Sequence, residues 1–144
     1  MASIQAPSAV TIQAITNSEP DILTNHYDDD NILSMTVSTY EEMNPRRRST
    51  MEDCHVFHAP GTWRAPDPGL AYLGIYDGHG GREMVEYLET FLSFHVAEEL
   101  RQEDHEANMA TRLERAFLIA DIHSTQCGVS TSGATVVTCL VKVS

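Results

Sequence analysis

The pattern of apolar and polar positions predicts three strands in the first half of the chain. NILSMTVSTY (31–40) has the alternating and β-branched character of a strand, and MEDCHVFHAP (51–60) is interpreted as a second strand that Pro60 and Gly61 end. The run LAYLGIYD (70–77) is apolar over most of its length, which is typical of a strand in the middle of a sheet. The segment before it holds Pro66 and Pro68, which disfavour regular structure, so we expect a loop there.

The period of the pattern changes at Gly81. Apolar residues then recur at spacings of three and four, which predicts a helix near residues 81–101 with one buried face. A weaker face of the same kind predicts a second helix near residues 111–127, and STSGATVVTCLVKVS (130–144) returns to the β-branched composition of a strand. His95 lies on the apolar face of the first helix, so we expect it to be a hydrogen-bonded core residue.

The order of these elements favours an α+β fold. Strands come first, two helices follow in succession, and a strand then returns. A doubly wound parallel sheet would need strands and helices in regular alternation. We therefore expect an antiparallel sheet covered by a helical hairpin, in a domain over residues 31–144 that follows a polar N-terminal extension over residues 1–30.

Composition narrows the classes of function. The 144 residues carry a net charge of −12, which argues against nucleic acid as a partner because phosphate backbones require a basic surface. The three cysteines are odd in number and have no Cys-x-x-Cys spacing, so we expect neither a disulfide framework nor a thiolate zinc site. No apolar stretch approaches the roughly 20 residues that span a bilayer, so we expect no membrane partner. These features predict a cytoplasmic or nuclear protein.

The segment Asp77-Gly-His-Gly-Gly, between the third strand and the first helix, carries the candidate chemistry. A dinucleotide fingerprint would need a glycine at position 83, where this chain has Glu83, and a phosphate-binding loop of the Walker type would need a Gly-Lys-Ser/Thr ending. A metal site is the third alternative. The carboxylate of Asp77 and the carbonyl of Gly78 are hard oxygen ligands, which suit Mg²⁺ or Mn²⁺.

Further charged groups lie upstream, in RSTMED (48–53). Glu52 and Asp53 are two more carboxylates on the neighbouring predicted strand. Adjacent strand residues point to opposite faces, so one is expected to bind an ion directly and the other through water or an outer contact. Arg48 is close enough in sequence to hold an anion over the metals. Carboxylates, a carbonyl, an arginine and a histidine together indicate phosphoryl chemistry.

RSTMED, YDGHGG and TSGAT occur in that order, and together they resemble the first three signatures of the metal-dependent PP2C-type protein serine/threonine phosphatases. The similarity covers about residues 32–143. It implies the N-terminal portion of a sandwich of antiparallel sheets flanked by helices, with two Mg²⁺ or Mn²⁺ ions in the complete domain. It also implies phosphoprotein substrates, whose phosphoserine or phosphothreonine is hydrolysed by a metal-activated water.

The resemblance assigns a role to each candidate residue. Asp77 would bridge the two metals, Gly78 would lend its carbonyl, and Glu52 would bind one ion. Asp53 would support water bound to the metals. As catalytic groups, Arg48 would hold the substrate phosphate and His79 would protonate the leaving oxygen. TSGAT has no titratable group, so we expect it to allow a close backbone approach.

The resemblance also implies later metal ligands, in an Asp-Gly and an Asp-Asn motif. Neither motif occurs after Asp77. Two divalent ions carry four positive charges, whereas Glu52 and Asp77 offer two negative ones as direct ligands. We therefore expect weak catalysis from these 144 residues alone. The alternative hypothesis is a truncated, non-catalytic fragment that binds phosphoproteins or a phosphatase partner.

Overall fold

The computed structural model describes residues 37, 39 and 50–143. The predicted strand at 31–40 falls outside the described residues except for these two isolated positions. The domain boundary predicted at residue 30, and Arg48, also fall outside them. All helices and strands reported below belong to one compact unit, Thr50–Lys142.

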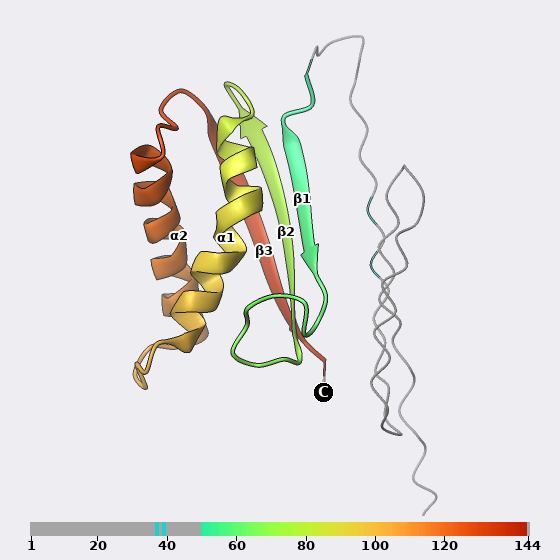
Figure 1. The fold of residues 1–144 in the computed structure, drawn as a ribbon, viewed down its shortest axis with the longest axis vertical. Coiled ribbons are helices and arrows are strands. Elements are labelled where there is room, and N and C mark those ends of the chain that lie inside the picture. The colour runs from blue at the N-terminus through green and yellow to red at the C-terminus, as the bar shows by residue number, and fades with distance from the viewer. Residues whose placement is uncertain (1–36, 38, 40–49, 144) are drawn as a thin grey trace, which may run out of the picture. The chain divides into compact units, whose positions relative to one another are not determined.

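The unit contains one antiparallel sheet of three strands, in the order β1-β2-β3 (Figure 1). β1 is Asp53–His58, β2 is Leu70–His79 and β3 is Gly133–Lys142. β2 lies in the middle, with Asp53 opposite Asp77 on one side and Gly78 opposite Ala134 on the other. The apolar run at 70–77 was predicted to form a central strand, and it does lie in the centre of the sheet. A central strand is flanked by strands on both sides, so few of its residues face water.

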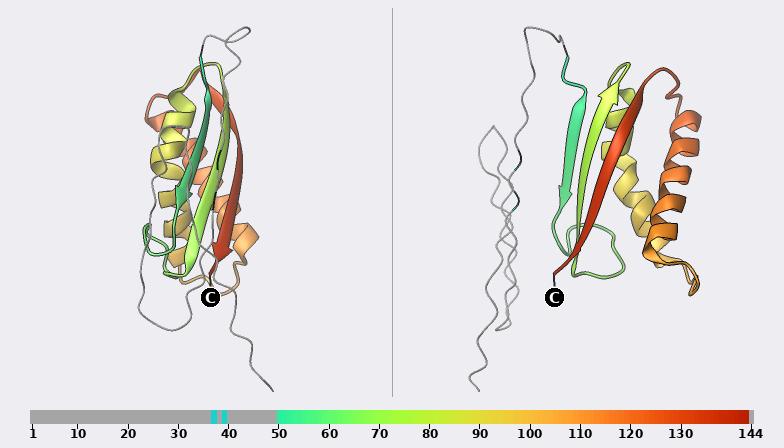
Figure 2. Two further views of the ribbon diagram at one scale, coloured as in Figure 1. Left: turned by 90° about the vertical axis from the view of Figure 1, so that its right-hand side faces the viewer. Right: turned by 180° about the vertical axis from the view of Figure 1, so that it is seen from behind.

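Two helices cover one face of this sheet, as the views in Figure 2 show. α1 (Glu83–Arg101) packs on all three strands and α2 (Met109–Gln126) packs on α1. The core between them is built on Tyr72 and Tyr76 of β2, whose side chains are fully buried. Their hydroxyl groups share a hydrogen bond of 2.8 Å. Burial raises the pKa of Tyr72 to about 12 and also raises that of Tyr76, so both remain neutral.

The period of two along β2 separates the two faces of the sheet. Tyr76 and Gly78 are buried under the helices, whereas Ile75, Asp77 and His79 are exposed on the opposite face. This opposite face, which we call the open face, is covered by no helix in the compact unit (Figure 2). The alternation places the candidate residues Asp77 and His79 on the open face and leaves Gly78 between them against α1.

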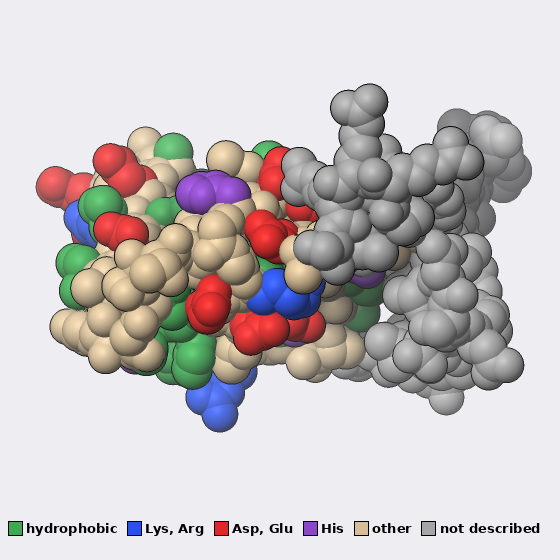
Figure 3. Space-filling model, turned by 90° about the horizontal axis from the view of Figure 1, so that it is seen from above, with side chains coloured by type: hydrophobic (Ala, Val, Ile, Leu, Met, Phe, Trp, Pro, Cys, Tyr) green, Lys and Arg blue, Asp and Glu red, His purple; other side chains and the backbone are tan. Residues whose placement is uncertain are grey.

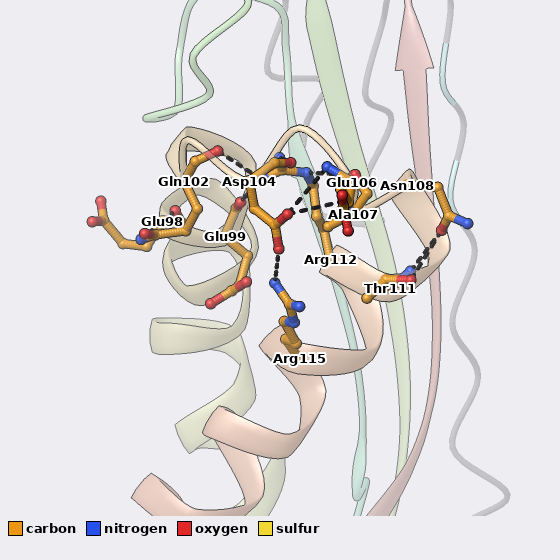
Figure 4. A network of polar contacts seen from close by, with 10 residues as sticks. All are labelled: Glu98, Glu99, Gln102, Asp104, Glu106, Ala107, Asn108, Thr111, Arg112 and Arg115. Carbon is orange, nitrogen blue, oxygen red and sulfur yellow. Dashed lines mark hydrogen bonds and ion pairs between the residues drawn. The ribbon is translucent and has the colours of Figure 1, made fainter.

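Polar contacts close the turn between α1 and α2 (Figure 4). Arg112 donates to the carbonyl oxygens of Glu99, Gln102 and Asp104, which lie at or just beyond the C-terminal end of α1. The Asp104 carboxylate accepts from Arg115 at 2.7 Å, and Asn108 caps α2 by accepting from the backbone N–H of Thr111 at 2.9 Å. These bonds satisfy helix-end groups that would otherwise lack partners, so the helical hairpin is firmly closed.

The predicted α+β fold is confirmed for this unit, with an antiparallel sheet and a helical hairpin. The helices predicted near 81–101 and 111–127 are observed at 83–101 and 109–126, and the strands predicted at 51–60 and 130–144 at 53–58 and 133–142. α1 begins only after Gly80 and Gly81, since their φ angles of 75° and 126° are incompatible with a right-handed helix. Within the described part of the chain, neither helix is long and apolar enough to cross a membrane.

Candidate functional site

The site is centred on two carboxylates that the sheet register brings together. Asp53 begins β1 and pairs directly with Asp77 near the end of β2. Both residues are exposed on the open face. Directly opposed residues of an antiparallel pair have Cβ atoms about 5 Å apart, within reach of one shared cation. Figure 3 views the molecule from above and shows several acidic side chains on this end, some of them around a basic one.

This carboxylate pair has no balancing partner in the described structure. Among the described residues, no ion pair and no side-chain hydrogen bond involves Asp53 or Asp77. Like charges directly opposite each other destabilise a sheet, and a cation between them removes that cost. The donors are hard oxygens, so their chemistry fits Mg²⁺ or Mn²⁺.

The two carboxylates are too few to bind a metal ion tightly by themselves. The described residues contain no group of three or more His, Cys, Asp or Glu side chains arranged to hold a metal ion. Mg²⁺ requires several well-placed ligands, because it gives up its water reluctantly. Two carboxylates are fewer ligands than such an ion needs, so the described residues alone do not form a complete metal site.

Glu52 lies one residue before β1, and its backbone is pressed against Gly78. A Cβ atom on Gly78 would stand 2.3 Å from the carbonyl oxygen of Glu52 and 2.8 Å from Cγ1 of Val85. Only glycine permits so close an approach of the two chains. The carboxylate of Glu52 accepts a hydrogen bond of 3.1 Å from the hydroxyl of Thr50. Its role as a direct metal ligand remains a prediction.

His79 ends β2 on the same face as Asp77 and is exposed. Its partner across the ladder to β3 is Gly133. A Cβ atom at Gly133 would lie 2.7 Å from Nε2 of the His79 ring, so the glycine makes room for the imidazole. The glycine of TSGAT thus permits a close approach, as the sequence predicted, although the group that approaches is a side chain.

Two residues near this site were not predicted. The hydroxyl of Ser132 accepts a hydrogen bond of 3.0 Å from the backbone N–H of Met84, and it caps α1 from the start of β3. Arg82, at the N-cap of α1, donates from Nη1 to the carbonyl oxygen of Met51. A cation at a helix N-terminus opposes the helix dipole, so its presence could have signalled a specific contact.

A cluster of Tyr87, His95 and His123 lies between the two helices. The hydroxyl of Tyr87 is 3.0 Å from Nε2 of His95 and 2.8 Å from Nδ1 of His123. Burial lowers the pKa of His95, and the neighbouring His123 lowers it further. The prediction that His95 is a hydrogen-bonded core residue is confirmed, and the cluster lies on the helix-covered side of the sheet, away from the carboxylate pair.

The chain is similar in sequence to a known family of proteins. The family model described as protein phosphatase 2C matches residues 39–144. A human protein, "Probable protein phosphatase 1N", is 37% identical over 101 residues, which cover 66% of this chain and 22% of the relative. The yeast "Protein phosphatase 2C homolog 2" is 30% identical over 77 residues, or 52% of this chain and 16% of that protein. The chain thus spans between 16% and 22% of the length of these two relatives.

A solved structure supports the same fold. The structure described as that of a C. elegans sex determining protein superimposes with a TM-score of 0.56 and 24% sequence identity. The match covers 67% of this chain and 24% of that one. At this level of identity the likeness concerns the arrangement of helices and strands.

Proposed function

Since the chain belongs to the protein phosphatase 2C family, we propose that it forms part of an enzyme that removes phosphate from phosphoserine and phosphothreonine in proteins. The observation that carries this proposal is the pair of Asp53 and Asp77 on the open face, which no described cation balances, together with a histidine at the end of β2. Carboxylates that converge without a cation are suited to a divalent metal, and phosphoryl transfer is the chemistry that such metals commonly assist.

The proposed roles are those that the family resemblance implies for these residues. The carboxylates of Asp77 and Glu52 and the carbonyl of Gly78 would hold Mg²⁺ or Mn²⁺, and Asp53 would orient water beside them. When bound, the metal supplies the positive charge that activates water as a nucleophile and offsets the charge of the phosphate. Arg48 would bind the phosphate oxygens, since a guanidinium suits that geometry.

His79 would act as the general acid. Hydrolysis of a phosphoserine leaves an alkoxide oxygen, which needs a proton, and histidine titrates nearest neutrality among the side chains. The exposed position of His79 supports this role, because a substrate must reach the ring. The glycine at position 133 supports it as well, since it leaves room for the imidazole beside β3.

The open face supports a second candidate, in which the chain acts by docking onto another phosphatase segment. Ile75 and Val137 pair across β2 and β3, and 63% and 68% of their surfaces are exposed. Neighbouring apolar side chains of this kind are typical of a surface that is covered in the complete assembly. This candidate requires binding by this chain but no turnover.

Activity assays separate the two candidates. The 144-residue chain, and a chimaera that adds the C-terminal remainder of a phosphatase 2C relative, are incubated with Mn²⁺ and a phosphothreonine peptide. We expect slow hydrolysis by the chain and fast hydrolysis by the chimaera. In the chimaera, Asp77→Asn should abolish turnover, and His79→Gln should slow it by about 10²–10⁴-fold while Mn²⁺ binding persists.

The controls determine how the result is interpreted. Asp121→Asn removes an exposed acid from α2, so it should leave turnover unchanged. Full activity of the Asp77→Asn chimaera would rule out the proposed mechanism. An inactive chimaera in which this chain still binds the added segment tightly would favour the docking candidate.

A further inference from the structure

We propose that Arg82 is a positioning residue for the carboxylates of Glu52 and Asp53. The inference rests on the proposed function, because it assigns Arg82 to the metal site that those carboxylates would form. No signature quoted from the sequence includes Arg82. It lies directly after the glycines that end the loop, at the N-cap of α1.

The contacts of Arg82 connect α1 to the segment that precedes β1. Nη1 donates to the carbonyl oxygen of Met51, 31 residues earlier in the chain. Nε donates to the carboxylate of Glu86 at 3.3 Å, one turn further along the helix. Met51 is followed directly by Glu52 and Asp53, so the guanidinium holds the backbone immediately before both carboxylates.

The ion pair with Glu86 does not by itself explain why an arginine occupies position 82. Its side chains are 40% and 61% exposed, and exposed ion pairs of this kind contribute little to stability. A cation at the N-terminal end of a helix is also unfavourable, because the helix dipole is positive there. The hydrogen bond from the Arg82 guanidinium to the Met51 carbonyl is therefore the contact that explains an arginine at this position. The contact with Glu86 helps to orient the guanidinium toward that carbonyl.

The backbone before β1 is therefore held on two sides. Gly78 allows the carbonyl of Glu52 to lie closer than any side chain would permit, and Arg82 holds the preceding carbonyl against α1. Both contacts come from the segment that follows Asp77. The same short stretch that supplies one carboxylate thus sets the position of the strand that supplies the others. Groups that orient metal ligands in this way strongly affect metal affinity.

The test uses the 144-residue chain with Arg82→Met, and Arg82→Lys as the conservative variant. Two quantities are measured: amide hydrogen exchange of residues 51–54 without metal, and Mn²⁺ affinity by calorimetry. We expect Arg82→Met to accelerate exchange at these residues, to leave exchange in the centre of β2 unchanged, and to weaken Mn²⁺ binding by about 10–100-fold. Lysine can still donate to the carbonyl, so Arg82→Lys should recover part of both losses.

The other end of α1 offers a matched control. Arg101 also donates to a distant backbone carbonyl, that of Arg64, and also pairs with a glutamate of its own helix, Glu98. Arg101→Met therefore removes the same kinds of contact at the opposite end of the sheet. It should leave both exchange at residues 51–54 and Mn²⁺ affinity unchanged.

Three outcomes would overturn the proposal. Unchanged exchange in Arg82→Met would show that the contact does not hold the strand. Faster exchange with unchanged Mn²⁺ affinity would show a purely structural contact. If the unsubstituted chain binds Mn²⁺ no better than Asp77→Asn does, the carboxylates of this chain do not bind the ion by themselves, and the positioning role proposed for Arg82 is lost. The exchange data would then still show whether Arg82 holds the backbone, so the two failures are distinguishable.

Discussion

Asp53 and Asp77 lie directly opposite each other on β1 and β2, and both point away from the helices. This relationship connects two signatures that are more than twenty residues apart in the sequence. Like charges directly opposite each other carry an electrostatic cost in a sheet, and this pair lies at the place of the candidate chemistry.

Removing one of these charges should stabilise the metal-free chain. We expect Asp53→Asn to raise Tm by a few degrees without metal, because relieving a pair of like charges is worth up to about 1 kcal/mol. It should also reduce the further rise in Tm that Mn²⁺ produces, since a ligand stabilises only as far as it binds the folded state. Thermal unfolding with and without MnCl₂ measures both effects. Asp121→Asn is the control, and an equal response from it would contradict the idea of a site-specific repulsion.

Substitution of Gly78 should disturb both the fold and the site. The added Cβ of Gly78→Ala would meet the carbonyl of Glu52 and the side chain of Val85, at an overpacking cost of about 1–3 kcal/mol. Urea denaturation gives the change in the free energy of unfolding. Adding Val85→Ala removes only the side-chain contact, so a double-mutant cycle should show partial relief. Complete relief would mean that the Glu52 backbone is not the obstacle.

Stability should decrease in mild acid because of His95. Burial lowers its pKa in the folded state below the ordinary value of 6.5, so the unfolded chain binds a proton first as the pH falls. The contribution of His95 is fully present above pH 6.5 and declines as the pH drops through that value. The groups around the ring, Tyr87 and His123, offer no negative charge to offset protonation.

The measurement is the free energy of unfolding between pH 8 and pH 5.5. His95→Gln should lower stability at pH 8, where the bond to Tyr87 is lost, and should flatten the decline toward pH 5.5. The exposed His105 serves as the comparison, since His105→Gln should keep the slope of the unsubstituted chain. A slope that His95→Gln leaves intact would assign the pH dependence to other groups.

The open face should govern self-association of the isolated chain. We expect Val137→Lys to reduce association at high protein concentration, because it places a charge beside Ile75 in the middle of the apolar surface. Sedimentation velocity measures the change. Leu118→Lys alters a residue of α2 that is 58% exposed on the helical side, so it should have little effect. Equal effects of the two substitutions would show that association is not specific to the open face.

The periodic elements were predictable because their signal is local. Spacings of three and four placed α1 and α2, and an apolar run placed β2, each within a few residues of its observed bounds. The residues at which these helices and strands begin and end depended on backbone geometry. β2 continues two residues past Asp77 to His79, because Gly78 and His79 still pair with Ala134 and Gly133 of β3. Such pairing depends on a strand more than fifty residues away and leaves no local trace.

The sequence by itself determined which groups are present at the site: carboxylates at 52, 53 and 77, glycines around His79, and their order along the chain. Only the tertiary structure decided which of them meet. The register places Asp53, rather than Glu52, opposite Asp77, and a shift of one residue would have exchanged their faces. The hydrogen bond from Arg82 to Met51 could not be predicted from the sequence either. The acceptor is a backbone carbonyl, so its position depends on the fold and the Met51 side chain gives no sign of it.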